Sequence, residues 1–206
     1  MRILASVKVR LFLICWIVFS AFFATNVVRE HYPAFALIER GDWQCDRFYG
    51  MHADLFRHTD GHVYSGNNLM GSLITALPLV VFDPLLDKLE EHSKAELALH
   101  PESLDAAYDT KYPLRRAMFR RVKEAGLDLR FGASTALTSA FLMAPLSALF
   151  VVLMYATLVA RRIARERAVW LALLFAFATP VLYRSAHLNH NMFLMEVLFG
   201  AFLLLW

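Results

Sequence analysis

The sequence predicts an all-α integral membrane protein, with about four transmembrane helices and further helices in one long extracytoplasmic loop. Hydrophobic residues make up 58% of the 206 residues, and the mean hydropathy is +0.46, whereas roughly 45–50% of an ordinary soluble domain is apolar. Four apolar stretches are almost free of charge, and they lie at 11–28, 133–160, 168–183 and 191–206. A helix of about 20 apolar residues crosses the hydrocarbon layer, and lipid permits little else. We therefore treat 1–206 as a single membrane domain.

Basic residues predict how the four stretches are oriented. Lys8 and Arg10 precede the first stretch, and an arginine cluster follows the second, at Arg161, Arg162, Arg165 and Arg167. Positive charge close to a span marks the cytoplasmic side, so we expect a cytoplasmic N-terminus and an extracytoplasmic loop at 29–132. The first stretch also resembles a cleaved signal peptide, but it is longer than a usual signal core, which favours a retained anchor. This placement accounts for the net charge of +3, and we expect no nucleic-acid partner.

One segment of the loop, 69–86, is apolar enough to cross the membrane itself. If it crossed, every later span would invert and the arginine cluster would lie outside. We therefore expect an interfacial or shallow re-entrant helix that Asp83-Pro84 ends. A separate polar helix is expected to follow at 86–99.

The last part of the loop, 101–126, is expected to form another polar helix that is broken at Tyr112-Pro113. Basic and apolar side chains alternate within 114–125. This pattern suits contact with an anionic membrane surface, and it equally suits a solvated helix.

Candidate chemistry begins directly after the first stretch. Arg29-Glu30 places a carboxylate just outside the membrane, and the neighbouring arginine favours its charged form. Such a group can act as a general base, or the two residues can form a plain interfacial ion pair. Further along the loop, Gly66 and Gly71 permit close backbone approach by a sugar or phosphate, and Tyr64 supplies an aromatic face and a hydroxyl.

Histidines and carboxylates in the same loop are weak candidates for a metal site. Asp54, His58 and His62 are spaced four residues apart, which would place them on one face of a helix. Asp60-Gly61 lies between the two histidines and indicates a turn instead. A metal site and solvated loop histidines therefore both stay open.

Polar groups near the later stretches are further binding candidates. Glu196 lies about two turns into the last stretch, where ionisable groups usually face a cavity or a partner. Asn189 would share its helical face, and His190 would lie at the outer mouth. Arg184 and His187 suit a lipid phosphate, or they extend to the headgroups as interfacial residues.

Short motifs occur along the chain in a recognisable order. They are Arg29-Glu30, 37–42, 61–65, 71–73, 76–78, the Arg161-Arg162 turn, 178–180 and 188–191. Their order and spacing resemble the amino-terminal part of bacterial GT-C glycosyltransferases, and more narrowly the protein mannosyltransferase and aminoarabinose-transferase relatives.

The resemblance implies a transferase that takes a sugar from a polyprenyl-phosphate donor and passes it to a lipid, glycan or protein acceptor. The reaction would occur at the outer face of the bacterial inner (plasma) membrane, among membrane lipids, and often with a divalent metal cation. The acidic catalytic residue of such enzymes maps onto Glu30, with Asp42 and Asp46 as alternatives. The expected substrate-binding residues are Arg29, His62, Tyr64, Ser65, Gly71, Arg184, His190 and Glu196.

The chain departs from the family pattern in two places. Relatives usually carry a proline-glycine pair where this chain has 68–71, and they continue for several helices beyond the position of Trp206. We therefore expect the amino-terminal part of a larger module, or one part of a split enzyme. The alternative is a non-catalytic multi-pass membrane protein, such as a transporter segment, a scaffold or a degenerate transferase remnant.

Overall fold

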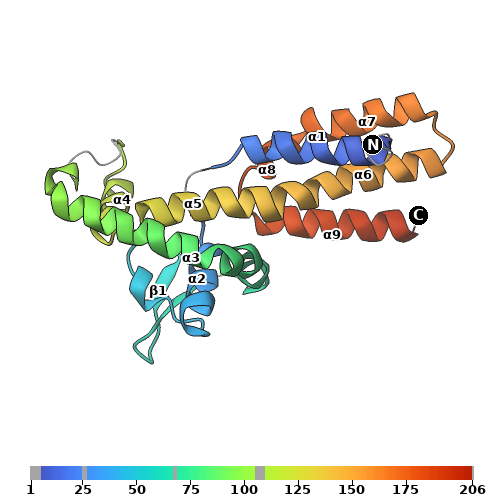
Figure 1. Cartoon of the computed structure of the whole chain (residues 1–206). Coiled ribbons are helices and arrows are strands. Elements are labelled where there is room, and N and C mark those ends of the chain that lie inside the picture. Colours follow the sequence, from blue (N-terminus) through green and yellow to red (C-terminus); the bar gives the residue numbers. More distant parts are fainter. Residues whose placement is uncertain (1–5, 25–26, 67–68, 105–109, 206) are drawn as a thin grey trace. The chain divides into compact units, whose positions relative to one another are not determined.

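The computed structural model describes residues 6–24, 27–66, 69–104 and 110–205 (Figure 1). It is 74% helix and 3% strand, so the prediction of a helical protein is confirmed, with one small hairpin added. The chain forms two compact units. One is Thr25–Thr135, and the other combines Met1–Ala24 with Ala136–Trp206. The boundary between them falls inside a helix.

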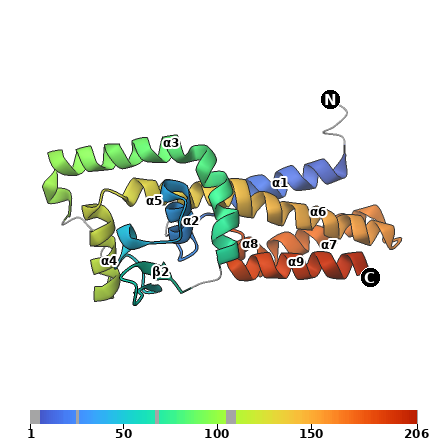
Figure 2. The ribbon, with the colours of Figure 1, turned by 90° about the horizontal axis from the view of Figure 1, so that it is seen from below.

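The unit made from the two ends of the chain is a helical bundle. Its elements are α1 (Val7–Ala21), η4 (Ser139–Met143), α6 (Ala144–Ala160), α7 (Arg165–Phe177), α8 (Pro180–Arg184) and α9 (His190–Leu205). Helix α6 packs against α1, α7 and α9 (Figures 1 and 2). The buried face of α6 carries the small residues Ala144, Ser147 and Ala148, which allow neighbouring helices to approach closely.

The segment η4 is a π-helical stretch inside a longer helix. Helix α5 (Asp128–Thr138), η4 and α6 together form one apolar helix, Asp128–Ala160, which contains the predicted stretch 133–160. A π-turn disturbs the regular pairing of backbone carbonyls. The indole Nε1 of Trp16 donates to the carbonyl oxygen of Ala140 at 2.6 Å, so α1 supplies a partner at this irregular turn.

Two of the predicted stretches are shorter as helices than expected. Helix α1 ends at Ala21 rather than near 28, and the amide of Ala24 donates to the carbonyl of Ala186 at 3.0 Å. The stretch 168–183 is divided between α7 and α8, because Pro180 cannot donate a backbone hydrogen bond. Helix α9 agrees with the predicted stretch 191–206 as far as the structure describes it.

Among the described residues, two helices are long and apolar enough to cross a membrane, by length and composition alone. They are Leu69–Leu99 and Asp128–Ala160, and His190–Leu203 is a shorter apolar helix. Membrane crossing by all four predicted stretches stays a prediction.

The unit Thr25–Thr135 consists of helices around a small hairpin. Its elements are α2 (His31–Arg40), η2 (Asp46–Phe48), β1 (Leu55–Arg57), β2 (Val63–Ser65), α3 (Leu69–Leu99), η3 (Pro101–Leu104), α4 (Pro113–Glu124) and the start of α5. Strands β1 and β2 are antiparallel, with Phe56 opposite Tyr64. The core is aromatic: Phe35 and Phe131 stack with their ring centroids 5.4 Å apart, and Tyr32 and Phe48 pack beside them.

Helix α3 corrects the expected boundary at Asp83-Pro84. It continues without interruption to Leu99 and contains Pro78 and Pro84. Figure 2 shows a sharp bend in its path, as expected where proline removes a backbone hydrogen bond and crowds the preceding turn. The apolar segment 69–86 and the polar segment 86–99 are therefore two arms of one bent helix.

The apolar arm of α3 has two different faces. Ser72, Thr75 and Leu79 are buried, and α3 packs against α2. Leu77 and Val81 are among the large apolar side chains that stay exposed. The arm thus combines a packed face with an apolar surface.

Helix α4 begins at Pro113, as the expected break at Tyr112-Pro113 predicts. Proline is well suited to the first turn, where its missing N–H costs nothing. Val122 is the buried residue of α4, while Arg115 and Arg120 are exposed. Residues 105–109 of the expected helix lie outside the described residues.

Candidate functional site

Glu30 lies at the start of α2 and is almost fully buried. Its side chain is 4% exposed. A tight turn holds this position: the amide of His31 donates to the carbonyl of Val28 at 2.9 Å, and the amide of Val28 donates to Nδ1 of His31 at 3.2 Å. The aromatic core anchors the following turn of α2 through Tyr32 and Phe35.

Gly71 lies directly against Glu30. A Cβ atom at Gly71 would be 3.3 Å from Cγ of Glu30. Gly71 is in the first turn of α3 and is buried. The fold therefore brings together two residues that are 41 positions apart in the sequence, one selected for catalysis and one for substrate binding.

Arg29 joins Glu30 to a second carboxylate. Its Nε is 3.6 Å from Oε1 of Glu30, and its Nη1 is 3.2 Å from Oδ2 of Asp54. The amide of Asp54 in turn donates to Nδ1 of His52 at 3.1 Å. We call Arg29, Glu30, His52, Asp54 and Gly71 the Glu30 cluster.

His52 was not singled out as a site residue in the sequence analysis. Burial lowers its pKa, and nearby Asp54 opposes that shift. The neutral imidazole is therefore favoured at neutral pH. The histidine content of the loop pointed to this region, but not to this residue.

His31 is a second histidine that sequence reasoning did not select. It is fully buried, and burial lowers its pKa to about 4. Its Nε2 has no hydrogen-bond partner among the described residues. Because Nδ1 accepts from Val28, the neutral ring carries its proton on Nε2.

Asp46 stabilises the hairpin. Its Oδ1 accepts from the amide of Val63 at 2.6 Å, and its Oδ2 lies 2.8 Å from Nδ1 of His62. The hydrogen bond from His62 lowers the pKa of Asp46, and the same bond raises the pKa of His62. These contacts give Asp46 a structural role at the start of η2.

The tip of the hairpin is also held by polar contacts. The hydroxyl of Tyr64 donates to Oδ2 of Asp60 at 3.0 Å, and the amide of His62 donates to Oδ1 of Asp60 at 2.9 Å. The Oγ of Ser65 is buried and has no partner within the described ranges. His62, Tyr64 and Ser65 are thus gathered on β2 and its approach.

Asp54, His58 and His62 do not share a helical face, and the turn that Asp60-Gly61 indicated is present. The amide of His58 donates to the carbonyl of His62 at 2.8 Å across the Asp60-Gly61 turn, so a hairpin separates the two histidines. Asp54 is paired with Arg29 instead. In the part of the chain that the structure describes, no group of three or more His, Cys, Asp or Glu side chains could hold a metal ion.

Asp42 lies at the exposed end of α2. The helix ends at Gly41, whose φ of 75° is left-handed and therefore favours glycine. Oδ1 of Asp42 accepts from the amide of Gln44 at 2.9 Å and pairs with Arg40 at 3.0 Å. The Asp42 side chain is 39% exposed and that of Asp46 is 38% exposed, so Glu30 is the buried member of the three candidate carboxylates.

The bundle contains the remaining candidates as a separate group. Glu196 on α9 is 1% exposed, and its Oε1 accepts from the hydroxyl of Ser147 on α6 at 2.8 Å. Its Oε2 has no partner among the described residues. Asn189 precedes α9 and accepts from the amide of Asn191 at 2.9 Å, so it does not share a helical face with Glu196.

Three candidate residues lie on α8, α9 and the segment that joins them. Arg184 and His187 were predicted to bind a phosphate, and His190 to bind substrate. Arg184 ends α8, and its guanidinium lies 6.0 Å from the ring centroid of Tyr183. His187 packs edge-on against the same ring at 5.5 Å. Burial, followed by the nearby Arg184, lowers the pKa of His187. His190 begins α9.

Arg130 forms a buried ion-pair network that the sequence did not reveal. Its guanidinium lies 3.0 Å from Oδ1 of Asp83 and 3.4 Å from Oε1 of Glu39, and it also bonds to Asp87. Arg47 pairs with Glu39 at 2.7 Å. The network links α2, α3 and the start of α5.

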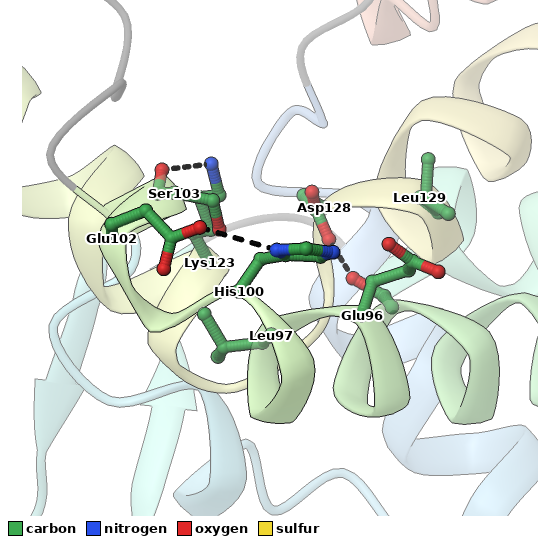
Figure 3. A pocket seen from close by; sticks show the side chains of 9 residues that line it. Glu96, Leu97, His100, Glu102, Ser103, Lys123, Asp128 and Leu129 are labelled. Carbon is green, nitrogen blue, oxygen red and sulfur yellow. Dashed lines mark hydrogen bonds and ion pairs between the residues drawn. The ribbon is translucent and has the colours of Figure 1, made fainter.

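A polar cavity of about 440 Å³ lies at the end of α3 (Figure 3). Nδ1 of His100 is 3.1 Å from Oε1 of Glu102. Lys123 donates to the carbonyl of Ser103, and Ser93 donates to Asp128. These bonds satisfy several lining groups, and they join α4 to η3 and α3 to α5.

Comparison of the chain with protein-family models, with curated proteins and with solved structures finds no match. The resemblance to GT-C transferases therefore stays an expectation, and the candidate site is defined by its own geometry.

Proposed function

We propose that this chain is part of a GT-C-type membrane glycosyltransferase that transfers a sugar from a polyprenyl-phosphate donor to a lipid, glycan or protein acceptor. The observation that carries the proposal is the buried carboxylate of Glu30 against Gly71. A carboxylate removed from water makes strong electrostatic interactions, and Nε of Arg29 lies 3.6 Å from Oε1 of Glu30.

In the proposed reaction Glu30 is the general base. It takes the proton from the acceptor hydroxyl as that oxygen attacks the anomeric carbon of the sugar. The bond between the anomeric carbon and the phosphate oxygen breaks, and the polyprenyl phosphate leaves with the electron pair. Arg29 contacts Glu30 and Asp54, and its planar guanidinium also suits a phosphate oxygen.

A divalent cation does not fit the Glu30 cluster in the present arrangement. Cations of this kind prefer several oxygen ligands, and the Arg29 guanidinium lies between the carboxylates of Glu30 and Asp54. The proposed steps therefore use only the residues of the chain.

The proposed setting is the plasma (inner) membrane, with the four predicted stretches spanning it and a cytoplasmic N-terminus. The apolar arm of α3 would lie at the outer membrane surface as an interfacial helix. The exposed apolar residues of that arm support this placement, because an interfacial helix buries one apolar face in the headgroup region.

The test is sugar transfer in membranes that contain the protein, with undecaprenyl phosphate carrying radiolabelled mannose, glucose or aminoarabinose as donors in turn. We expect Glu30→Gln to lower transfer about 100-fold or more, the usual contribution of a general base, at an unchanged membrane level of the protein. Asp42→Asn is the matched control, because it neutralises an exposed carboxylate of the same loop. Full transfer by Glu30→Gln would refute the assignment, and no transfer by the unmodified protein would favour the non-catalytic alternative.

A further inference from the structure

A second cavity, of about 450 Å³, lies within the helical bundle. It forms where the start of α1, the end of α6 and the start of α7 meet, and all three belong to the same compact unit. Its polar lining residues are Ser6, Lys8, Tyr155 and Arg165. None of them belongs to the candidate transfer site.

Two cationic side chains from different helices line this cavity. Lys8 is in the first turn of α1, and Arg165 begins α7. Both are exposed, and neither forms an ion pair with another described residue. Their charge is therefore available to an anion.

The two helix starts beside the cavity add backbone donors. Ser6 precedes α1 and Ala164 precedes α7, and neither supplies a side-chain hydrogen bond to its helix. The first amides of each helix consequently lack a capping acceptor. The positive ends of both helix dipoles also favour a negative group at this position.

Tyr155 supplies an observation that does not depend on helix ends. It lines the cavity from α6 and is only 5% exposed. Its hydroxyl has no hydrogen-bond partner among the described residues. The side chain is thus buried and lines the cavity while its hydroxyl stays unbonded within the described ranges, so this group is free to donate to something bound there.

We propose that this cavity binds a phosphate group, and specifically the phosphate of an anionic phospholipid headgroup. Lys8 supplies a positive charge, and Arg165 supplies paired hydrogen-bond donors. With the free amides of the two helix starts, these are the groups that bind phosphate in proteins. In the proposed orientation Lys8 and Arg165 lie at the cytoplasmic membrane surface, where anionic phospholipids are present. The lipid source rests on the proposed membrane insertion, but not on the proposed transferase activity.

The test measures binding to the full chain purified in a neutral detergent. Thermal unfolding is followed against increasing dioleoylphosphatidylglycerol, dioleoylphosphatidylcholine and inorganic phosphate, and the concentration dependence gives an apparent Kd. We expect stabilisation by phosphatidylglycerol but not by phosphatidylcholine. Lys8→Gln/Arg165→Gln should weaken that Kd by about thirtyfold, the effect of two basic groups, and Tyr155→Phe should weaken it by a few fold without changing any charge.

Arg162→Gln/Arg167→Gln is the matched control, because it removes two exposed charges from the same end of the bundle without touching the cavity lining. Retained affinity in this control supports a built site. Equal weakening by both double variants would reduce the effect to surface attraction and overturn the proposal, as would equal stabilisation by the two lipids. Inorganic phosphate could stabilise the protein as strongly as phosphatidylglycerol does, and lose that effect in Lys8→Gln/Arg165→Gln. This result would support the phosphate site and overturn the assignment of a lipid as its ligand.

Discussion

Glu30, Asp42 and Asp46 belong to one loop, yet their surroundings give them different roles. Asp42 and Asp46 satisfy nearby backbone amides and are more than one-third exposed, whereas Glu30 is enclosed beside Gly71. The order of motifs in the sequence was enough to select Glu30. Its enclosure by α3 was not predictable, because it depends on residues far along the chain. His52 was missed because its hydrogen bond to the Asp54 amide is local, and what links it to the cluster is the ion pair between Asp54 and the distant Arg29.

The close approach at Gly71 leads to a prediction for Gly71→Ala. The new methyl group would press on Glu30 at 3.3 Å and displace its carboxylate, so we expect transfer to fall about tenfold or more, since small misplacements of a catalytic group are costly. Stability should change by less than about 1 kcal/mol, because alanine favours the helix. Gly132→Ala is the control, since nothing lies within 4 Å of its added methyl group. Unchanged transfer in Gly71→Ala would show that Glu30 does not need this position.

Asp46 and His62 give a prediction about pH. The mutual hydrogen bond raises the pKa of His62 and lowers that of Asp46. The raised histidine pKa contributes stability that is present below its unfolded pKa and is lost as pH rises through the folded value. The lowered aspartate pKa contributes stability that is present above its unfolded pKa and is lost as pH falls through the folded value. The pair therefore stabilises the hairpin most strongly at mildly acidic pH.

Titration of the His62 ring protons by NMR checks this. In Asp46→Asn the pKa of His62 should fall toward its ordinary range, and the hairpin should lose its pH dependence between mildly acidic and neutral pH. His58 in the same spectra is the internal control, because its closest carboxylate is Asp60, at 3.5 Å. A His62 titration that does not change in Asp46→Asn would contradict the role given to this pair.

At the scale of elements, local signals and tertiary contacts compete, and α3 shows which prevails. Asp83-Pro84 is a local stop signal, but Asp83 binds Arg130 and α2 packs along α3, so the helix bends and continues. The hairpin is the opposite case. There the local Asp60-Gly61 turn prevails over a four-residue spacing that would suit a helix, and Asp46 supports the turn by bonding to His62 and Val63.

The Arg130 network should be a main source of stability in the unit Thr25–Thr135. We expect Arg130→Ala to destabilise the fold by about 3 kcal/mol, because it removes the buried cation that Glu39, Asp83 and Glu90 share and leaves Asp83 without an ion-pair partner among the described residues. Arg120→Ala breaks only an exposed pair with Glu124 and should cost no more than about 0.5 kcal/mol. Denaturant unfolding in detergent measures both. Equal costs for the two variants would show that the network contributes no more than a surface pair.

At the scale of the whole molecule, composition predicted a helical protein. It did not determine which of the apolar helices would cross a membrane. The long apolar helix Asp128–Ala160 was largely anticipated, since 133–160 is free of charge. The division into two compact units was not anticipated. One of its two boundaries, between Thr135 and Ala136, falls inside a helix, where the sequence carries no linker. Burial of Glu196 agrees with its expected position two turns into α9, and Ser147 was an unforeseen partner.

The proposed orientation predicts which introduced cysteines react from outside the cell. Glu91→Cys should be labelled by a membrane-impermeant maleimide, whereas Arg165→Cys should be labelled only after the membrane is opened. Both positions are exposed. The native Cys15 and Cys45 are buried, and burial raises the pKa of Cys45 to about 12, so the background should be low. Outside labelling of Arg165→Cys would show that 69–86 crosses the membrane and that every later span is inverted.

The buried network around Arg130 also has a consequence for the order of biosynthesis. Asp83, Asp87 and Glu90 leave the ribosome about 40 residues before the arginine that neutralises them. Until Arg130 is made, Asp83 and Asp87 lack the cation that binds both of them in the finished fold. In the proposed membrane setting, unpaired carboxylates disfavour insertion of 86–99 into the bilayer during synthesis. Arg130 then forms the ion pairs that stabilise the folded unit.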